Sequence, residues 1–235
     1  MTAFNRSSTR HAAAFAIVAA HNEADRIAAT LAALAEAFPG IPVWVADDGS
    51  SDGTAGIAQA AGATVVRSER TIGKGAAVTL AARAALASVG ENESVALICD
   101  GDLGSSAVRL GPLVEAVSCG DANLAVAVFS RRLGGGFGLA VGFAGWAIRR
   151  RCGLVPRAPI SGQRALRAST LAQLLPFAPG YGMEIGMTID AVRAHARVIE
   201  LDLDLDHRAT GRTFGGFVHR GRQLIDFLGV YLTRR

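Results

Sequence analysis

The chain has 235 residues, of which 50% are hydrophobic and 19% are charged, and its mean hydropathy is +0.31. This composition excludes a disordered chain and indicates a compact fold whose sheet is buried on both faces. The formal net charge of +4 suits anionic small molecules or a lipid surface as partners. No basic block is dense enough to indicate binding to nucleic acid, so no nucleic-acid partner is expected.

The cysteines and the apolar segments indicate the compartment. Cys99, Cys119 and Cys152 form no CxxC pair, which argues against a disulfide framework or a zinc cluster and predicts a reducing environment. The apolar stretch Ala12–Ala20 is followed directly by charges and lacks a cleavage site, so it predicts a strand rather than a signal peptide. The uncharged run Leu133–Ile148 is shorter than the roughly 20 residues that span a bilayer. We therefore expect a cytoplasmic protein.

The first hundred residues alternate strand and helix signals, which is typical of a mostly parallel sheet. The predicted strands are Ala14–Ala20, Val43–Ala46, Thr64–Val66 and Val95–Cys99, and the predicted helices between them are Asp25–Phe38, Ala55–Ala61 and Ala76–Ser88. Polar clusters follow three of the strands, and ligands of such sheets bind at the carboxyl ends of the strands. The sequence therefore predicts one binding site built from loops that are distant along the chain.

The second half is less regular, and its predicted elements end in a helical tail. They are a helix at Arg109–Ser118, a strand at Leu124–Phe129, a glycine-rich loop at Arg131–Gly145, helices at Ser169–Leu175 and Met183–His195, a strand at Val198–Asp206 and a helix at Phe214–Arg235. The strict alternation of Val198–Asp206 indicates that its acids form a solvated strand face. We expect a domain over residues 1–210 and a C-terminal amphipathic helix within 211–235.

Asp100-Gly101-Asp102 follows a predicted buried strand and places two carboxylates on either side of one glycine. Hard oxygen ligands of this kind bind Mg²⁺ or Mn²⁺, and the ion would bridge the oxygens of a diphosphate. The alternative interpretation is a pair of solvated aspartates in a turn.

Two further segments have residues suited to binding a nucleotide. Asp47–Thr54 (DDGSSDGT) is longer and more polar than a plain turn requires, which predicts a loop that grips a base and a ribose. Lys74 is the only lysine among the 24 basic residues and lies between two glycines, which indicates an ammonium held close to phosphate. The chain lacks the spacing of a Walker loop, and no GxGxxG follows the first strand, so a dinucleotide-binding fold is not expected.

Together these segments resemble the GT-A nucleotide-sugar glycosyltransferases of family 2. The resemblance spans about residues 14 to 210 and rests on these motifs in order: AIVAAHNEADRIAATLAAL, VWVADDGSSDGT, GKGAA, ICDGDL, SGQRALR, LLPFAPGYGMEIGMTID and LDLDHR. The stretch PFAPGYGMEIG is most similar to glucosyl-3-phosphoglycerate synthases, while the first half resembles polyprenyl-phosphate sugar transferases equally well. The resemblance implies an α/β, Rossmann-like GT-A fold: a single domain with a mostly parallel central sheet flanked by helices.

The resemblance also implies roles for individual residues. Those matched to the nucleotide site are Ala20, His21, Asn22, Glu23, Asp47, Asp48, Ser50, Lys74, Asp100 and Gly101. Those matched to the metal site are Asp102, Asp100 and His207. Glu184 matches a carboxylate beside the transferred sugar, so Glu184, Lys74 and Asp102 are the candidate catalytic residues.

The implied activity is metal-dependent transfer of a sugar, with glucose expected, from a UDP-sugar to a phosphorylated acceptor. The acceptor is either a small molecule similar to phosphoglycerate or a lipid phosphate such as polyprenyl phosphate, and the stereochemical outcome stays open between them. A sugar-phosphate nucleotidyltransferase is one alternative, although AAHNEAD replaces the glycine-rich, arginine-containing loop expected after its first strand. A non-catalytic nucleotide-binding scaffold is the other.

The glycine-rich segment Leu133–Ile148 departs from the phosphoglycerate enzymes, so their acceptor residues do not transfer to this chain. Arginines flank the segment on both sides, and two interpretations follow. It could be a lid over the acceptor, or its apolar side could lie on the inner face of a membrane with the arginines on the headgroups. The tail could likewise pack on the domain or on a second subunit of a homodimer.

Overall fold

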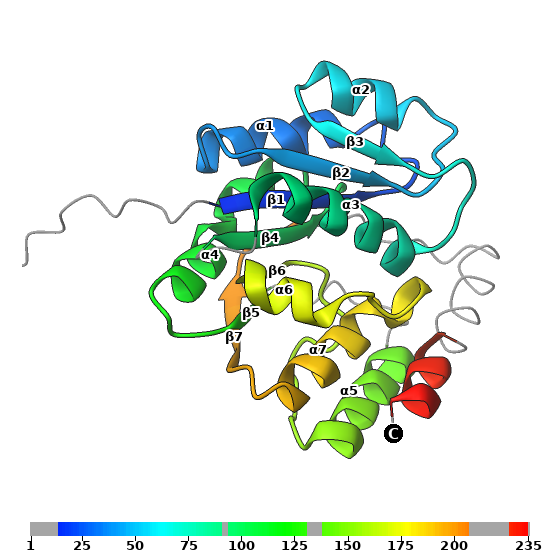
Figure 1. The fold of residues 1–235 in the computed structure, drawn as a ribbon, viewed down its shortest axis with the longest axis vertical. Coiled ribbons are helices and arrows are strands. Elements are labelled where there is room, and N and C mark those ends of the chain that lie inside the picture. Colours follow the sequence, from blue (N-terminus) through cyan, green and yellow to red (C-terminus); the bar gives the residue numbers. More distant parts are fainter. Residues whose placement is uncertain (1–13, 91–93, 131–137, 207–225, 235) are drawn as a thin grey trace, which may run out of the picture.

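The computed structural model describes residues 14–90, 94–130, 138–206 and 226–234. Figure 1 shows one central sheet with helices on both of its faces, in a single domain. The strands are β1 (Ala14–Ala20), β2 (Val43–Asp47), β3 (Thr64–Arg67), β4 (Val95–Asp100), β5 (Leu124–Phe129), β6 (Arg164–Arg167) and β7 (Val198–Leu203). The predicted α/β class and sheet agree with this architecture.

The helices between these strands are also close to those predicted. They are α1 (Ile27–Ala37), α2 (Thr54–Ala60), α3 (Lys74–Val89), α4 (Gly111–Ser118), α5 (Gly138–Cys152), α6 (Ala168–Leu174), α7 (Met183–Arg193), the 3₁₀ helices η1 (Gly104–Leu110) and η2 (Gly180–Gly182), and a last helix at 226–233. The remainder of the predicted tail helix, and the expected boundary at residue 210, lie outside the described residues. Among the described helices, none combines the length and the apolar character needed to cross a bilayer.

The strand order is β3-β2-β1-β4-β6-β5-β7. The first four of these strands are parallel, β6 runs antiparallel to both of its neighbours, and β5 and β7 are parallel. Ala20 pairs with Asp47, and Ala19 pairs with Asp100. The loops after β1, β2 and β4 therefore begin side by side at one edge of the sheet, where ligands of open α/β folds bind.

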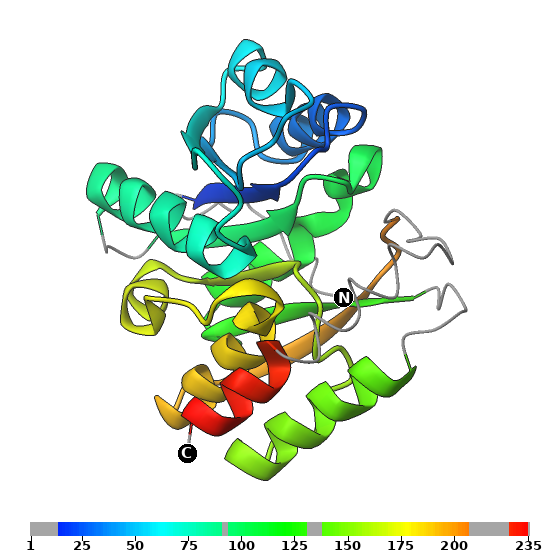
Figure 2. The same ribbon diagram turned by 90° about the vertical axis from the view of Figure 1, so that its right-hand side faces the viewer.

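Alternate residues of β1 enter two different apolar layers, as the pleat of a strand requires. Ala16 and Val18 pack in the layer formed with α1, η1 and α4. Phe15 and Ile17 pack in the layer formed with α3, α6 and α7. A third and smaller cluster joins α5, α7 and the last helix, which lie together in Figure 2. Because both faces of β1 are buried, its sequence is an unbroken apolar run.

The prediction of a loop up to Gly145 is wrong, because α5 begins at Gly138. Ala144 and Ile148 of this helix are fully buried in the third cluster. Their packing outweighs the low helix propensity of the glycines, since tertiary contacts supply most of the stability of a helix. Residues 131–137 of the predicted loop lie outside the described residues.

Two further differences concern the far half of the sheet. β6 escaped prediction because its four residues, RALR, show no run of apolar side chains. The acids after Val198 are not simply a solvated face, since Glu200 accepts hydrogen bonds from the backbone amides of Arg157 and Ala158 at 2.8–3.0 Å. Asp202 lies 2.5 Å from the guanidinium of Arg157. These acids anchor the segment that leads into β6.

The start of α3 is packed at backbone distance against the chain that leads into η2. A Cβ atom at Gly75 would lie 1.8 Å from the carbonyl oxygen of Ala178. We expect Gly75→Ala to lower the free energy of unfolding by about 2 kcal/mol or more, because neither backbone can yield without repacking. Urea denaturation measures this difference.

Gly142→Ala in α5 is the matched control, because nothing lies within 4 Å of its Cβ position. It should leave the stability unchanged or raise it by about 0.5–1 kcal/mol, the helix preference for alanine over glycine. Equal losses in the two variants would contradict the close packing at Gly75.

Candidate active site

The loops after β1 and β2 are tied together by hydrogen bonds. The backbone amide of Asn22 donates to Ser50 Oγ, and that of Glu23 donates to Thr54 Oγ1, each at 2.9 Å. In return, the amide of Ser51 donates to Asn22 Oδ1 at 2.9 Å. Asn22 has φ of +57°, a left-handed conformation that asparagine tolerates better than most residues. The residues of these two loops that were predicted to bind the nucleotide therefore lie next to one another.

Asp47 and Asp48 hold backbone rather than facing solvent, since they are 0% and 6% exposed. Asp47 accepts a hydrogen bond from the amide of Ser50 at 3.0 Å. Asp48 accepts hydrogen bonds from the amides of Ile72 and Gly73 at 2.7–3.1 Å. The two carboxylates thus fix the backbone of the loop after β2 and of the loop that leads into α3.

His21, Ala20 and Gly101 contribute through the same backbone network. The ring Nδ1 of His21 lies 2.8 Å from the carbonyl oxygen of Asp48, and the amide of Asp48 donates to the carbonyl oxygen of Ala20 at 3.0 Å. The amide of Gly101 donates to the carbonyl oxygen of Ala19 at 2.8 Å. These bonds join the ends of β1, β2 and β4 into one surface.

Arg67, at the end of β3, borders the candidate site, and sequence analysis did not identify it. Its Nη2 donates to the carbonyl oxygen of Ser50 at 2.7 Å, and its Nε lies 3.3 Å from Asp47 Oδ2. The side chain is 56% exposed, so a cation borders the loop after β2. Its position directly after a predicted strand was the signal that could have identified it.

Lys74 joins three elements at the edge of the sheet. It is the first residue of α3, and the φ of +93° at Gly73 before it requires glycine. Its Nζ lies 2.6 Å from Asp100 Oδ1 and 2.7 Å from Glu184 Oε1. The side chain of Glu184 is only 6% exposed, whereas those of Lys74 and Asp100 are 21% and 30% exposed. Of the three predicted catalytic residues, the structure thus brings Lys74 and Glu184 into contact.

The two carboxylates determine the charge of this lysine. Burial by itself would lower the pKa of Lys74, but the charges of Asp100 and Glu184 and their hydrogen bonds outweigh it, so that the pKa is raised. The ammonium is therefore protonated at neutral pH. It can donate three hydrogen bonds, of which two go to these carboxylates.

A second cation, Arg164, lies close to the carboxylates of this cluster. It belongs to the SGQRALR motif, whose residues were given no individual role by sequence analysis. Arg164 is completely buried, and it donates to the carbonyl oxygen of Ser161 at 2.8 Å and to Thr188 Oγ1 at 2.9 Å. Burial lowers the pKa of Arg164 to about 10, against the opposing attraction of Glu184. At neutral pH it therefore still adds a positive charge next to the acids of the site.

The same segment also covers Asp100 directly. Gln163 Nε2 donates to Asp100 Oδ2 at 3.1 Å. A Cβ atom at Gly162 would lie 2.4 Å from Asp100 Oδ2 and 2.7 Å from Lys74 Nζ. Only glycine allows the backbone to lie so close to this ion pair.

The end of β4 carries two carboxylates, of which Asp100 already contacts Lys74 Nζ through Oδ1 and Gln163 Nε2 through Oδ2. Asp100 and Asp102 offer hard oxygen donors, and Mg²⁺ is commonly held by one or two carboxylates together with water and phosphate oxygens. Within the described residues, no three His, Cys, Asp or Glu side chains gather as a complete metal site. His207, the third predicted ligand, lies outside those residues.

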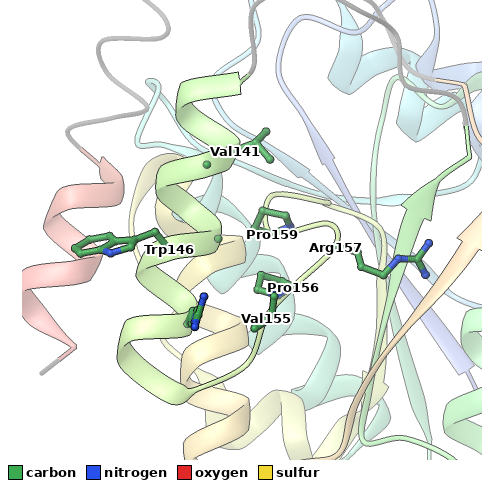
Figure 3. A pocket seen from close by; sticks show the side chains of 9 residues that line it. Val141, Trp146, Val155, Pro156, Arg157 and Pro159 are labelled. Carbon is green, nitrogen blue, oxygen red and sulfur yellow. The ribbon is translucent and has the colours of Figure 1, made fainter.

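A shallow groove of about 330 Å³ lies apart from this cluster, between α5 and the segment 155–159 (Figure 3). It is lined by Val141, Gly142, Gly145, Trp146, Arg149, Val155, Pro156, Arg157 and Pro159. None of the predicted site residues is among them. Val155, on the segment that borders the groove, is 69% exposed, whereas the ring of Trp146 points toward the last helix in Figure 3, 4.9 Å from the ring of Tyr231, and is 49% exposed.

Comparison with known proteins identifies the class. The fold is that of a GT-A glycosyltransferase, since it matches solved structures of this class with TM-scores of 0.75–0.76. The model of glycosyl transferase family 2 matches residues 15–147, and the chain belongs to this family. Among curated proteins, no sequence matches the chain.

Several crystal structures of glucosyl-3-phosphoglycerate synthase from Mycobacterium tuberculosis are similar to this chain. The complex with Mn²⁺, UDP and glucosyl-3-phosphoglycerate is 25% identical with a TM-score of 0.76, over 95% of this chain and 80% of that chain. The complex with Mn²⁺, UDP-glucose and phosphoglyceric acid is 26% identical with a TM-score of 0.75, over 95% and 79%. The complex with Mg²⁺ and UDP is 26% identical with a TM-score of 0.76, over the same shares. The predicted resemblance is confirmed.

The ion pairs of Lys74 can be tested by chemical labelling, because the chain has a single lysine. We expect an acetylating reagent to modify Lys74 slowly, since its raised pKa leaves little neutral amine. Gly162→Ala should raise the rate about threefold or more, because the new methyl group displaces the flexible ends of Lys74 and Asp100. Peptide mass spectrometry measures the rate.

Gly111→Ala is the control, since nothing lies within 4 Å of its Cβ position. It should leave the labelling rate unchanged. The same rate in Gly162→Ala as in the wild type would contradict the close approach of residue 162 to the ion pair.

Proposed function

We propose that the protein transfers glucose from UDP-glucose to a phosphorylated acceptor, with Mg²⁺ or Mn²⁺ bound at Asp100 and Asp102. The observation that carries this proposal is the Lys74–Asp100–Glu184 cluster, which lies beside the loops that follow β1 and β2. The similar crystal structures support it, because they contain UDP-glucose, Mn²⁺ and phosphoglyceric acid.

The nucleoside would lie over the interlocked loops after β1 and β2. In this proposal, Asn22, Glu23 and Ser50 border the uridine, while Asp47 and Asp48 act through the backbone that they hold in place. Ala20, His21 and Gly101 supply the neighbouring strand-end surface. The half-exposed guanidinium of Arg67 adds a cation at the same edge.

The diphosphate would lie between the end of β4 and Lys74. Asp100 and Asp102 would hold the ion, with His207 as the third ligand, and the bound ion would neutralise the charge of the departing UDP. Lys74 keeps one N–H beyond the two that face Asp100 and Glu184, and we assign it to a phosphate oxygen. Positive charge placed in advance where negative charge develops is commonly the largest catalytic contribution.

Glu184 would orient the transferred sugar or the acceptor. Its carboxylate is almost fully buried and is fixed by the ammonium of Lys74 at 2.7 Å. A carboxylate held in this way is a strong acceptor for a sugar hydroxyl group, which gives the bound donor one orientation. The acceptor would approach from the same edge of the sheet.

The proposed acceptor is a small phosphorylated acid similar to phosphoglycerate, and polyprenyl phosphate is the other candidate. The cytoplasmic location, a peripheral contact with the inner face of a membrane and a homodimer remain predictions. The experiment that tests the function incubates the full chain with UDP-glucose, Mn²⁺ and either 3-phosphoglycerate or a short polyprenyl phosphate. Mass spectrometry should detect one glucosylated phosphate product, and chelation of the metal should abolish it. No product with either acceptor and no binding of UDP would contradict the proposal.

Asp102→Ala should reduce UDP release in this assay by about 100-fold or more, because the divalent ion loses one of its carboxylate ligands. Asp121→Ala, which alters an exposed aspartate on the connection between α4 and β5, is the control and should keep wild-type activity. Thermal melting checks that both variants fold. Unchanged, metal-dependent turnover in Asp102→Ala would exclude this residue as a ligand.

A further inference from the structure

The last helix packs directly on the turn that precedes Glu184. Figure 2 shows this helix, in red, beside α5 and α7. Gly180, in η2, has φ of +57°, and a Cβ atom there would lie 2.0 Å from Asp226 Oδ2. A Cβ atom at Gly182 would lie 2.4 Å from Val230 Cγ2. Gly180 and Gly182 therefore leave the space that the side chains of Asp226 and Val230 occupy.

Polar contacts fasten the helix at both of its ends. At its start, Asp226 Oδ2 accepts a hydrogen bond from the backbone amide of Tyr181 at 3.0 Å. At its end, Arg234 donates to the carboxylate of Asp190, in α7, through Nε and Nη2 at 2.7–2.8 Å. Hydrogen bonds to a carboxylate are stronger than those between neutral groups. Between these ends, the buried Phe227 and Val230 complete the third apolar cluster.

The opposite side of the same turn lies against the start of α3. A Cβ atom at Gly73 would lie 3.1 Å from the backbone nitrogen of Gly180, and one at Gly75 would lie 1.8 Å from the carbonyl oxygen of Ala178. Residues 178–182 are thus clamped between the helix that carries Lys74 and the helix at 226–233. Glu184 follows this clamped turn directly, and its carboxylate meets Lys74 at 2.7 Å.

We propose that Asp226 is a positioning residue: it holds the amide of Tyr181, fixes the turn at 180–182, and so keeps the carboxylate of Glu184 in place against Lys74. This inference rests on the proposed function, which assigns Glu184 to the transferred sugar. Asp226 lies beside Gly180 and accepts from the amide of Tyr181, and in this proposal it acts on Glu184 only through that turn. Without this carboxylate, the amide of Tyr181 loses its hydrogen-bond acceptor, and the turn is no longer held on the side of the last helix. A displacement of about 1 Å at a reacting group can lower turnover by up to about 100-fold.

The test compares Asp226→Ala with Asp226→Asn, which keeps a side-chain oxygen as acceptor. Leu232→Ala, at a half-exposed position of the same helix, is the matched control. Hydrogen exchange of the amides at 178–187 reports on the turn, and thermal melting reports on the fold. Release of UDP from UDP-glucose with 3-phosphoglycerate and Mn²⁺ gives kcat and KM.

In Asp226→Ala we expect faster exchange at 178–187 and a kcat lowered about tenfold, with KM for UDP-glucose changed by less than about twofold, because only the geometry at Glu184 is affected. Asp226→Asn should restore most of kcat, and Leu232→Ala should behave as the wild type. Unchanged exchange or unchanged kcat in Asp226→Ala would overturn the proposal. Global unfolding of that variant would also overturn it, because Asp226 would then be a general determinant of stability.

The two proposals fail in different ways. A wild-type chain that neither releases UDP from UDP-glucose nor binds UDP counts against the proposed function. Exchange at 178–187 then still decides whether Asp226 holds the turn, since that measurement needs no substrate.

Discussion

The site is held together by one ammonium between two carboxylates. Lys74 joins the end of β4 to the first turn of α7, and its two partners lie on elements that are distant along the chain. A buried ammonium is costly alone, and so are two neighbouring carboxylates without a cation. Each group therefore requires the others, and the raised pKa of Lys74 expresses this mutual stabilisation. The ion cluster thus links the end of β4, the start of α3 and the first turn of α7, which also meet through the apolar layer of α3 and α7.

Glycines allow the close packing around the ion pairs of Lys74. Gly75, Gly162 and Gly180 each lie where a Cβ atom would come within 2.7 Å of another group: a carbonyl oxygen, the ion pair itself and the carboxylate of Asp226. These glycines belong to three motifs that are distant along the chain, yet all surround the same few side chains. Close approach explains glycine at 75 and 162, and at 180 it adds to a φ of +57°, which itself favours glycine.

Sequence analysis predicted the loops at the carboxyl ends of the strands better than it predicted the contacts that surround them. Strand-end reasoning located Asp100 and the two loops, because the register of parallel strands brings their carboxyl ends together. It could not show that Asp48 holds the loop before α3, since hydrogen bonds between distant segments leave no local pattern. Arg164 escaped because β6 is short and carries arginines. The glycine-rich start of α5 was misassigned because burial of Ala144 outweighs propensity.

Binding of UDP to Lys74→Arg, measured by calorimetry with and without Mn²⁺, tests the central claim most directly. A planar guanidinium is too wide for the space between Asp100 and Glu184 beneath Gly162, and it cannot present an N–H as the compact ammonium does. We expect the affinity for UDP with Mn²⁺ to fall about tenfold or more, the loss of one charge-assisted hydrogen bond, while the melting temperature changes little. Wild-type affinity in this variant would show that the ammonium of Lys74 does not contact the diphosphate.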